Sequence, residues 1–210
     1  MNQPARKRKK GELTRDSILD VAEELFAAHG FDGVPTRRIA TEAGISPGVL
    51  SYHYPAKESL FEAVVVRRAE ELNALRRAEI ERLPTITLEG LLEAFFSPFM
   101  SKIEEGGNGW KYYAQILAHV AQEARWAPLA GGLFAESARG YIALMREIVP
   151  GLVEDDALRA YVHLVSVMVG FFAATGLLDS FSQGRLRSDD FRANYKTTIS
   201  FVAGGIRALV

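Results

Sequence analysis

Apolar residues near the start of the chain recur at the spacing of one face of an α-helix. They follow the pattern i, i+3, i+4, i+7, i+8 and are Ile18, Val21, Ala22, Leu25 and Phe26. Thr14 precedes this stripe as a suitable N-cap, and Gly30 follows it, where a left-handed residue commonly ends a helix. The pattern therefore predicts a first helix over residues 14–29.

Two short helices are predicted after this one. Thr36 is the expected cap of a helix over residues 36–43, which Gly44 ends. Ser46 and Pro47 indicate another helix start, because Ser caps helices well and Pro is tolerated at the first helical position. A third, brief helix is therefore expected before the next proline.

The remaining residues also follow helical spacing, and few stretches alternate with the period of a strand. Pro98 should kink one of these helices by removing a backbone hydrogen bond. Glycines 106, 107 and 109 indicate a loop after it. We expect an all-α fold of about nine helices, the last six over residues 57–83, 88–105, 110–125, 129–149, 155–181 and 189–209.

Three helices with tight glycine turns in the first 55 residues are typical of a helix-turn-helix, in which the second helix of the pair presents its N-terminal half to DNA bases. Residues 36–54 read TRRIATEAGISPGVLSYHY. Ile39 and Ala40 should face inward, while Ile45 and Leu50 anchor the second helix. The expected outward positions are Arg37, Arg38, Pro47, Gly48, Val49, Ser51, Tyr52 and His53.

The stretch from Thr14 to about Val65 resembles the DNA-binding domain of TetR-family regulators, with its characteristic motifs in the segment from Leu25 to Val64. This segment reads LFAAHGFDGVPTRRIATEAGISPGVLSYHYPAKESLFEAV, and the order of its glycine–aromatic, Ile-Ala, Ala-Gly, Tyr-His-Tyr and Lys-Glu-Ser-Leu-Phe elements is characteristic of that family. The resemblance covers about a quarter of the chain. It implies a DNA-binding transcriptional regulator, most often a repressor, whose second domain binds a small-molecule effector and forms a homodimer.

The same resemblance implies roles for individual residues. Arg37 would reach a guanine edge with its bidentate fork, and Pro47, Gly48 and Val49 would meet bases, the last offering a methyl surface to thymine. Arg38 is more probable at a phosphate or in solvent than at a base. Phosphate contacts are implied for Thr36, Tyr52, His53 and Lys57.

Alternatives stay open for some of these residues. Tyr52 could simply pack between helices, and His53 could merely cap a turn. Ser51 stands where many relatives have Tyr, so one contact is shortened and the operator sequence is in doubt.

The distribution of charged residues along the chain bears on the expected domain organisation. Residues 1–57 contain nine Lys or Arg and seven Asp or Glu, and residues 58–210 contain 16 and 19. This asymmetry is a weak indication of a polyanion partner at one end. We expect a basic, disordered arm over residues 1–13, a DNA-binding domain over 14–57, and an effector-binding and dimerisation domain over 58–210.

Residues 160–178 carry no formal charge. Their length would admit a membrane span, but His163, Ser166 and Thr175 interrupt them and no second span exists. A helix that is apolar all round must instead be covered on two sides, by its own core and by another subunit. With the last helix, this predicts a two-fold dimer whose interface includes Tyr161, Gly170, Ala173, Ala174, Leu177 and Phe201. Such a dimer should read a palindromic operator.

Residues 88–149 are rich in aromatic side chains. They suit an apolar effector pocket with a few polar groups, although ordinary core is the more frequent role of any single aromatic residue. The candidates for lining the pocket are Phe95, Phe96, Phe99, Trp110, Tyr113, His119, Gln122, Trp126 and His163.

Two other functions compete with this interpretation. A sequence-independent architectural DNA protein would bind any duplex through phosphates. An enzyme has little support, because the chain has four scattered histidines, no cysteine and no Gly-rich phosphate loop. We therefore expect no catalytic residue, metal or cofactor. The absence of cysteine fits a reducing cytoplasm, and no apolar run after the basic start suggests a signal peptide.

Overall fold

The computed structural model describes residues 3–210, with side chains from Thr14 onward, and these residues form helices joined by turns and loops, without strands. The first part contains α1 (Gln3–His29), α2 (Thr36–Glu42), α3 (Pro47–His53) and α4 (Lys57–Glu81). The second contains α5 (Leu88–Glu105), α6 (Asn108–Gln122), a 3₁₀ turn η1 (Ala124–Trp126), α7 (Ala127–Ile148), α8 (Glu154–Ala173), α9 (Leu177–Phe181) and α10 (Phe191–Arg207). The all-α prediction is confirmed.

Helix α1 begins before the predicted N-cap. It spans Gln3–His29, so Thr14 lies inside it and does not cap it. Arg, Lys and Ala are good helix formers, so the residues before Thr14 suit a helix despite their charge. The side chains of residues 1–13 lie outside the described part, and the expectation of a basic, disordered arm over these residues stays a prediction.

One predicted helix is divided in two. Residues 155–181 form α8 and α9, separated where Ala174 and Gly176 take left-handed backbone conformations (φ 46° and 80°). Glycine adopts this conformation without steric cost and commonly ends helices. The described part therefore contains ten α-helices where about nine were expected.

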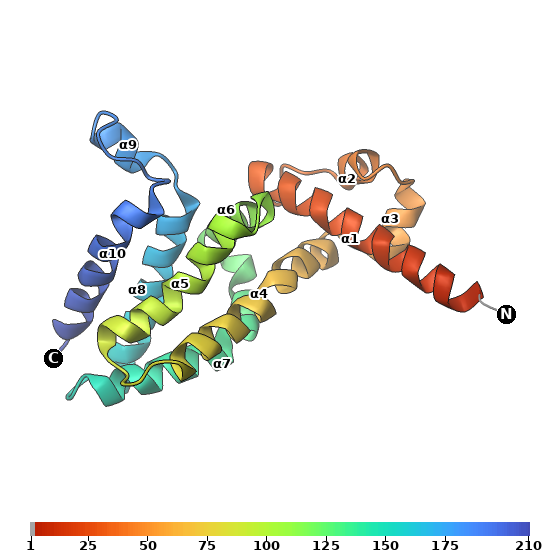
Figure 1. Cartoon of the computed structure of the whole chain (residues 1–210). Helices are drawn as coiled ribbons and strands as arrows, with labels where there is room; N and C mark the ends of the chain where they lie inside the picture. Colours follow the sequence, from red (N-terminus) through yellow and green to blue (C-terminus); the bar gives the residue numbers. More distant parts are fainter. Residues whose placement is uncertain (1–2) are drawn as a thin grey trace.

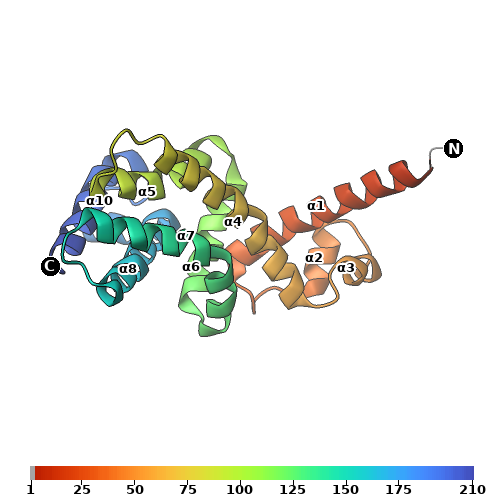
Figure 2. The same cartoon turned by 90° about the horizontal axis from the view of Figure 1, so that it is seen from below.

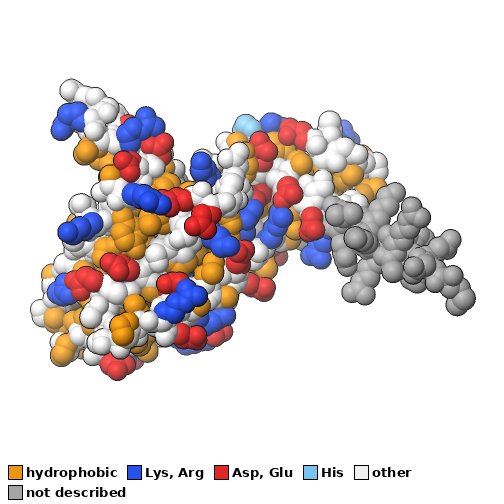
Figure 3. All heavy atoms as spheres, in the orientation of Figure 1, with side chains coloured by type: hydrophobic (Ala, Val, Ile, Leu, Met, Phe, Trp, Pro, Cys, Tyr) orange, Lys and Arg blue, Asp and Glu red, His pale blue; other side chains and the backbone are white. Residues whose placement is uncertain are grey.

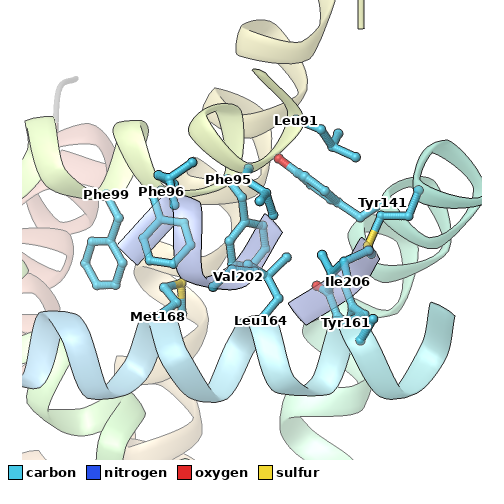
Figure 4. Packing of buried hydrophobic residues seen from close by; sticks show 14 of the residues in the cluster. Leu91, Phe95, Phe96, Phe99, Tyr141, Tyr161, Leu164, Met168, Val202 and Ile206 are labelled. Atoms are coloured by element: carbon cyan, nitrogen blue, oxygen red, sulfur yellow. The ribbon is translucent and has the colours of Figure 1, made fainter. Parts of the chain in front are cut away.

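The helices enclose two hydrophobic cores. In Figures 1 and 2, α1, α2 and α3 lie at one end of the molecule, and both α4 and α6 connect them to the other helices. The N-terminal core contains buried residues of α1 to α4, together with Ile116 and Val120 of α6 and Trp126 of η1. The second core lies among α4, α5, α6, α7, α8 and α10. Figure 4 shows Phe95, Phe96 and Phe99 of α5 directed toward Leu164 and Met168 of α8.

Helix α8 is the one helix in the described part that is long and apolar enough to cross a membrane. It packs against α6, α7 and α10 and contributes Leu164, Met168 and Phe172 to the second core. A third of its apolar window is buried within the chain (33%), so the second core covers one face of this helix.

Candidate nucleic-acid interface and effector cavity

The turn between α2 and α3 is closed by backbone hydrogen bonds. The amide of Ile45 donates to the carbonyl of Ala40 (3.0 Å), and Gly44 takes a left-handed conformation (φ 65°). Ser46 caps α3, since its hydroxyl accepts from the amide of Val49 (3.3 Å). Pro47 then occupies the first turn of α3, as predicted. This geometry fixes α3 against α2.

Helices α2 and α3 bury one face and expose the other. Ile39, Ala40 and Leu50 are buried, as predicted, and Ile45 is half-buried. The cap of α2 is Pro35, so the prediction of Thr36 as N-cap is wrong: Thr36 is the first helical residue, because Pro35 already has the extended backbone of a cap (ψ 139°). The exposed set is Thr36, Arg37, Arg38, Pro47, Gly48, Val49, Ser51 and Tyr52.

The exposed side chains differ in their freedom. The Arg38 guanidinium pairs with Glu42 one turn along α2 (2.7 Å), whereas Arg37 forms no ion pair with any side chain from Thr14 onward. Tyr52 is 83% exposed, so it does not pack between helices. Its ring contacts half-buried His53 (centroids 5.3 Å apart), and the Lys57 ammonium lies over Phe31 (4.3 Å). Arg37 and Tyr52 are thus both available to a partner.

The face of the molecule shown in Figure 3 is not strongly basic. On the face shown in Figure 3, Lys and Arg alternate with Asp and Glu over both parts of the molecule.

A cavity of about 740 Å³ lies in the second part of the molecule. Its wall is formed by α4, α5, α6, η1, α7 and α8 and is mostly apolar. The polar side chains in it are Arg76, Gln122, Glu123, Tyr161 and Ser166. A volume of this size suits a small organic ligand.

Of the nine side chains expected to line a pocket, Phe95 and Gln122 lie in the cavity wall. Phe96, Phe99, Trp110 and Tyr113 are buried in the second core, and Trp126 lies in the N-terminal core. His119 contacts the carbonyl of Ala27 (3.2 Å), and His163 is exposed. These seven assignments are wrong for this cavity, because aromatic content does not distinguish a packed core from a wall.

Tyr161 was assigned to the dimer interface, and this is also wrong. It is buried, lines the cavity and packs near Phe95 (centroids 6.0 Å apart). Nine positions separate it from Gly170, which at 3.6 residues per turn places the two on opposite sides of α8. Gly170, Leu177 and Phe201 are exposed, and Ala173 and Ala174 are half-buried.

Arg76 is the site residue that sequence reasoning missed. It is 2% exposed and lines the cavity. It continues the stripe of Phe61, Val65 and Leu72 along the buried face of α4, so an arginine in an apolar stripe was the available signal.

The cavity and the N-terminal core share residues. Val65 of α4 and Val120 of α6 lie in the cavity wall and also belong to the N-terminal core. On the same side, Arg68 of α4 pairs with Glu23 of α1 through two hydrogen bonds (2.5 and 2.7 Å). A molecule in the cavity therefore touches side chains that also support α1.

Known proteins match both parts of the chain. Residues 18–64 match the model for bacterial regulatory proteins of the tetR family, and residues 93–205 match the tetracyclin repressor-like C-terminal domain. The HTH-type transcriptional regulator UidR of Escherichia coli K12 is 37% identical over 68 residues, which are 32% of this chain and 35% of that protein. The matched segment thus spans about a third of that curated relative.

Solved structures share the fold over nearly the whole length. A tetR-family regulator from Rhodococcus RHA1 has a TM-score of 0.67 at 17% identity, covering 92% of this chain and 96% of that one. Bacillus subtilis FadR, solved in complex with stearoyl-CoA, has a TM-score of 0.67 at 13% identity, covering 90% and 97%. The two family models and this common architecture, with a helix-turn-helix at one end, show that the chain belongs to the TetR family of transcriptional regulators.

Proposed function

We propose that this chain is a cytoplasmic repressor that binds a palindromic operator as a homodimer and releases it when a small molecule enters the cavity. The observation that supports this most directly is the position of Val65 and Val120, which belong both to the cavity wall and to the N-terminal core. The regulator's two domains, proposed as residues 14–57 and 58–210, are in contact through these side chains.

At the operator, α3 enters the major groove and α2 lies across its edge. Arg37 and the Pro47–Val49 edge contact bases, while Thr36, Tyr52, His53 and Lys57 contact phosphates. Exposure of Arg37 and Tyr52 and the absence of an acidic partner for Arg37 among the described side chains support this assignment. Arg38, paired with Glu42, has the lesser role of a phosphate contact, and Ser51 leaves room beside the bases.

The dimer forms through α8 and α10. Phe201 is 71% exposed, and a methyl group added at Gly170, Gly204 or Gly205 would meet no other atom of the described chain. Small residues beside an exposed aromatic ring allow helices of two subunits to approach closely. The expected interface comprises Gly170, Ala173, Ala174, Leu177 and Phe201.

Binding of the effector moves α1, and α6 and α4 transmit this movement from the cavity. His119 and Val120 of α6 contact α1 and its core, and Arg68 of α4 holds Glu23. The effector must bind more tightly to the conformation that does not fit the operator, since only a difference in affinity shifts the equilibrium.

The operator is the first test. Selection from random duplex DNA with the purified chain should yield a palindrome, held about a thousandfold more tightly than unrelated DNA at physiological salt. Equal affinity for all duplexes would instead establish the architectural function.

Variants of α2 and α4 test the assigned contacts. Arg37→Ala should relax base preference at one position of each half-site by about 1–3 kcal/mol, whereas Arg38→Ala, its neighbour, should leave the preference intact. Lys57→Ala should weaken binding to all DNA sequences alike. It should also reduce the slope of log affinity against log salt concentration by about one unit. An unchanged base preference in Arg37→Ala would exclude its role as a base reader.

Phe201→Glu tests the dimer. A buried charge at the proposed interface should convert the dimer to a monomer in sedimentation analysis. Val153→Glu is the matched control. Val153 is also exposed (57%), and it lies at the N-terminal end of α8, whereas Gly170 and Ala173 lie at the C-terminal end. Dimers that persist in Phe201→Glu would place the interface elsewhere.

A further inference from the structure

The buried end of the cavity contains a cation without a carboxylate. Arg76 is 2% exposed, and no acidic side chain in the described part of the chain forms an ion pair with it. Its Nε donates to the carbonyl oxygen of Phe95 (3.0 Å), and its Nη2 contacts the Sδ of Met168 (2.9 Å). Its guanidinium lies over the Phe95 ring (3.7 Å). None of these partners carries a negative charge.

The ionisable groups that face Arg76 are neutral tyrosines. Tyr141, Tyr161 and Tyr113 act on its charge, and burial raises the pKa of each of them, so all three stay protonated at neutral pH. Burial also lowers the pKa of Arg76, which nevertheless remains charged because a guanidinium does not lose its proton in proteins. The positive charge is therefore not balanced by the chain.

A second polar group lies in the same cluster without a partner. The hydroxyl of Tyr141 is buried and forms no hydrogen bond with any described group. The Tyr141 ring packs against Phe95 (centroids 5.0 Å apart), the ring that underlies Arg76, and against Tyr161 (6.3 Å). Figure 4 shows Phe95, Tyr141 and Tyr161 gathered between α5, α7 and α8. Tyr141 packs against two wall residues, Phe95 and Tyr161, but is not itself among the residues that line the cavity.

The one carboxylate in the cavity wall does not serve Arg76. Glu123 lies at the end of α6, where neighbouring Gln122 and Ala124 are exposed, and it pairs with Arg125. The cavity thus has an exposed end whose charge is neutralised and a buried end that carries a free positive charge. The remaining wall is mostly apolar, and its other polar side chains are Gln122, Tyr161 and Ser166.

We infer that the effector is an organic anion, a monocarboxylate with an apolar body, whose carboxylate pairs with Arg76 at the buried end of the cavity. The ligand's apolar body occupies the wall between α7 and α8. This inference rests on the proposed function only for the statement that ligand binding in the cavity releases the operator. Binding itself can be measured without DNA.

The test is calorimetric titration of the full chain with octanoate, dodecanoate, hexadecanoate and phenylbutyrate, each beside the primary alcohol of the same skeleton, below micellar concentrations. At least one carboxylate should bind at least about thirtyfold more tightly than its alcohol, the effect of a buried charge pair. Dodecylamine should bind no more tightly than dodecanol. Equal affinity for acid and alcohol, preference for the amine, or failure of all four acids to bind would overturn the inference.

Arg76→Met should remove the preference for the acid while still binding the alcohol, which shows that the cavity remains folded. Arg77→Met is the matched control, because Arg77 is the next residue on α4 and is exposed; it should bind like the original chain. Persistence of the acid preference in Arg76→Met would overturn the inference.

Operator binding separates this inference from the proposed function. If a carboxylate binds through Arg76 but leaves operator affinity unchanged, release by an effector fails and the ligand assignment holds. If only neutral molecules bind and release the operator, the repressor function holds and the ligand assignment fails.

Discussion

Two arginines on α4, two turns apart, have opposite surroundings: Arg76 is buried, whereas the Arg68 side chain is 15% exposed. Arg68, near the N-terminal core, forms two hydrogen bonds with buried Glu23 and lies over Trp110 (5.0 Å). Arg76, in the cavity wall, has only a carbonyl oxygen, a thioether and an aromatic ring. A neutralised buried charge joins two helices. A buried charge that the chain leaves unbalanced costs free energy, and it is retained where something else supplies the anion.

Removing the carboxylate from the paired arginine should have the largest effect. Glu23→Gln leaves the half-buried Arg68 guanidinium without its carboxylate, and since loss of one member of a fully buried pair costs about 3–5 kcal/mol, we expect a loss of about 3 kcal/mol of folding free energy here. Urea denaturation would measure it. A loss below about 1 kcal/mol would mean that the two arginines do not differ as described.

Replacing the unpaired arginine should have the opposite sign. Arg76→Met removes a buried, unbalanced charge and keeps the volume, so we expect the unfolding free energy to rise by about 2 kcal/mol. Arg77→Met, at the exposed neighbour, should change it by less than about 0.5 kcal/mol. A large destabilisation in Arg76→Met would indicate that the guanidinium holds the fold together.

The residues shared by the cavity wall and the N-terminal core should couple ligand binding to operator binding. Val120→Ala removes two methyl groups from the wall shared by the cavity and the N-terminal core, at about 1–2 kcal/mol of stability. It should also weaken the response of operator affinity to ligand. Val149→Ala is the control, since both valines are 6% exposed and Val149 belongs to the second core alone. An equal loss of response in both would argue against the shared wall.

Removing the carboxylate from an exposed arginine–carboxylate pair should have the smallest effect on the free energy of unfolding. Arg67 pairs with Asp20 (2.6 Å) between the same two helices as Arg68 and Glu23, but the Asp20 side chain is 63% exposed. Asp20→Asn should therefore cost less than about 1 kcal/mol in urea denaturation, because solvent screens the pair. A cost like that of Glu23→Gln would show that burial is not what separates them.

The sequence predicted the helix-turn-helix well because its signals are local. Gly30 and Gly44 take left-handed conformations, and Ser46 caps α3, each from chemistry within a few residues. The cavity depends on contacts between distant segments. Trp126 is as aromatic as Phe95, yet it packs with Phe31 and Phe61 in the N-terminal core (5.0 and 4.5 Å).

Arg76 was missed because the composition of a segment does not show which other segments lie beside it in space. The polar candidates predicted from the sequence are His119, Gln122 and His163, and none of them is on α4, which precedes the aromatic region in the chain but lies beside it in space. Likewise, Tyr161 was assigned by the apolar character of its helix, and only the angular position on α8 places it in the cavity. Side-chain direction was the missing information in both cases.

Val65 and Val120 also limit how this regulator can diversify. A substitution there that adapts the cavity to a new ligand alters the packing beneath α1 at the same time, so ligand choice and operator affinity change together. Phe134 and Val169, on α7 and α8, line the cavity without belonging to the N-terminal core. Descendants with new effectors and unchanged operators should therefore have accumulated their substitutions on the α7 and α8 side of the wall.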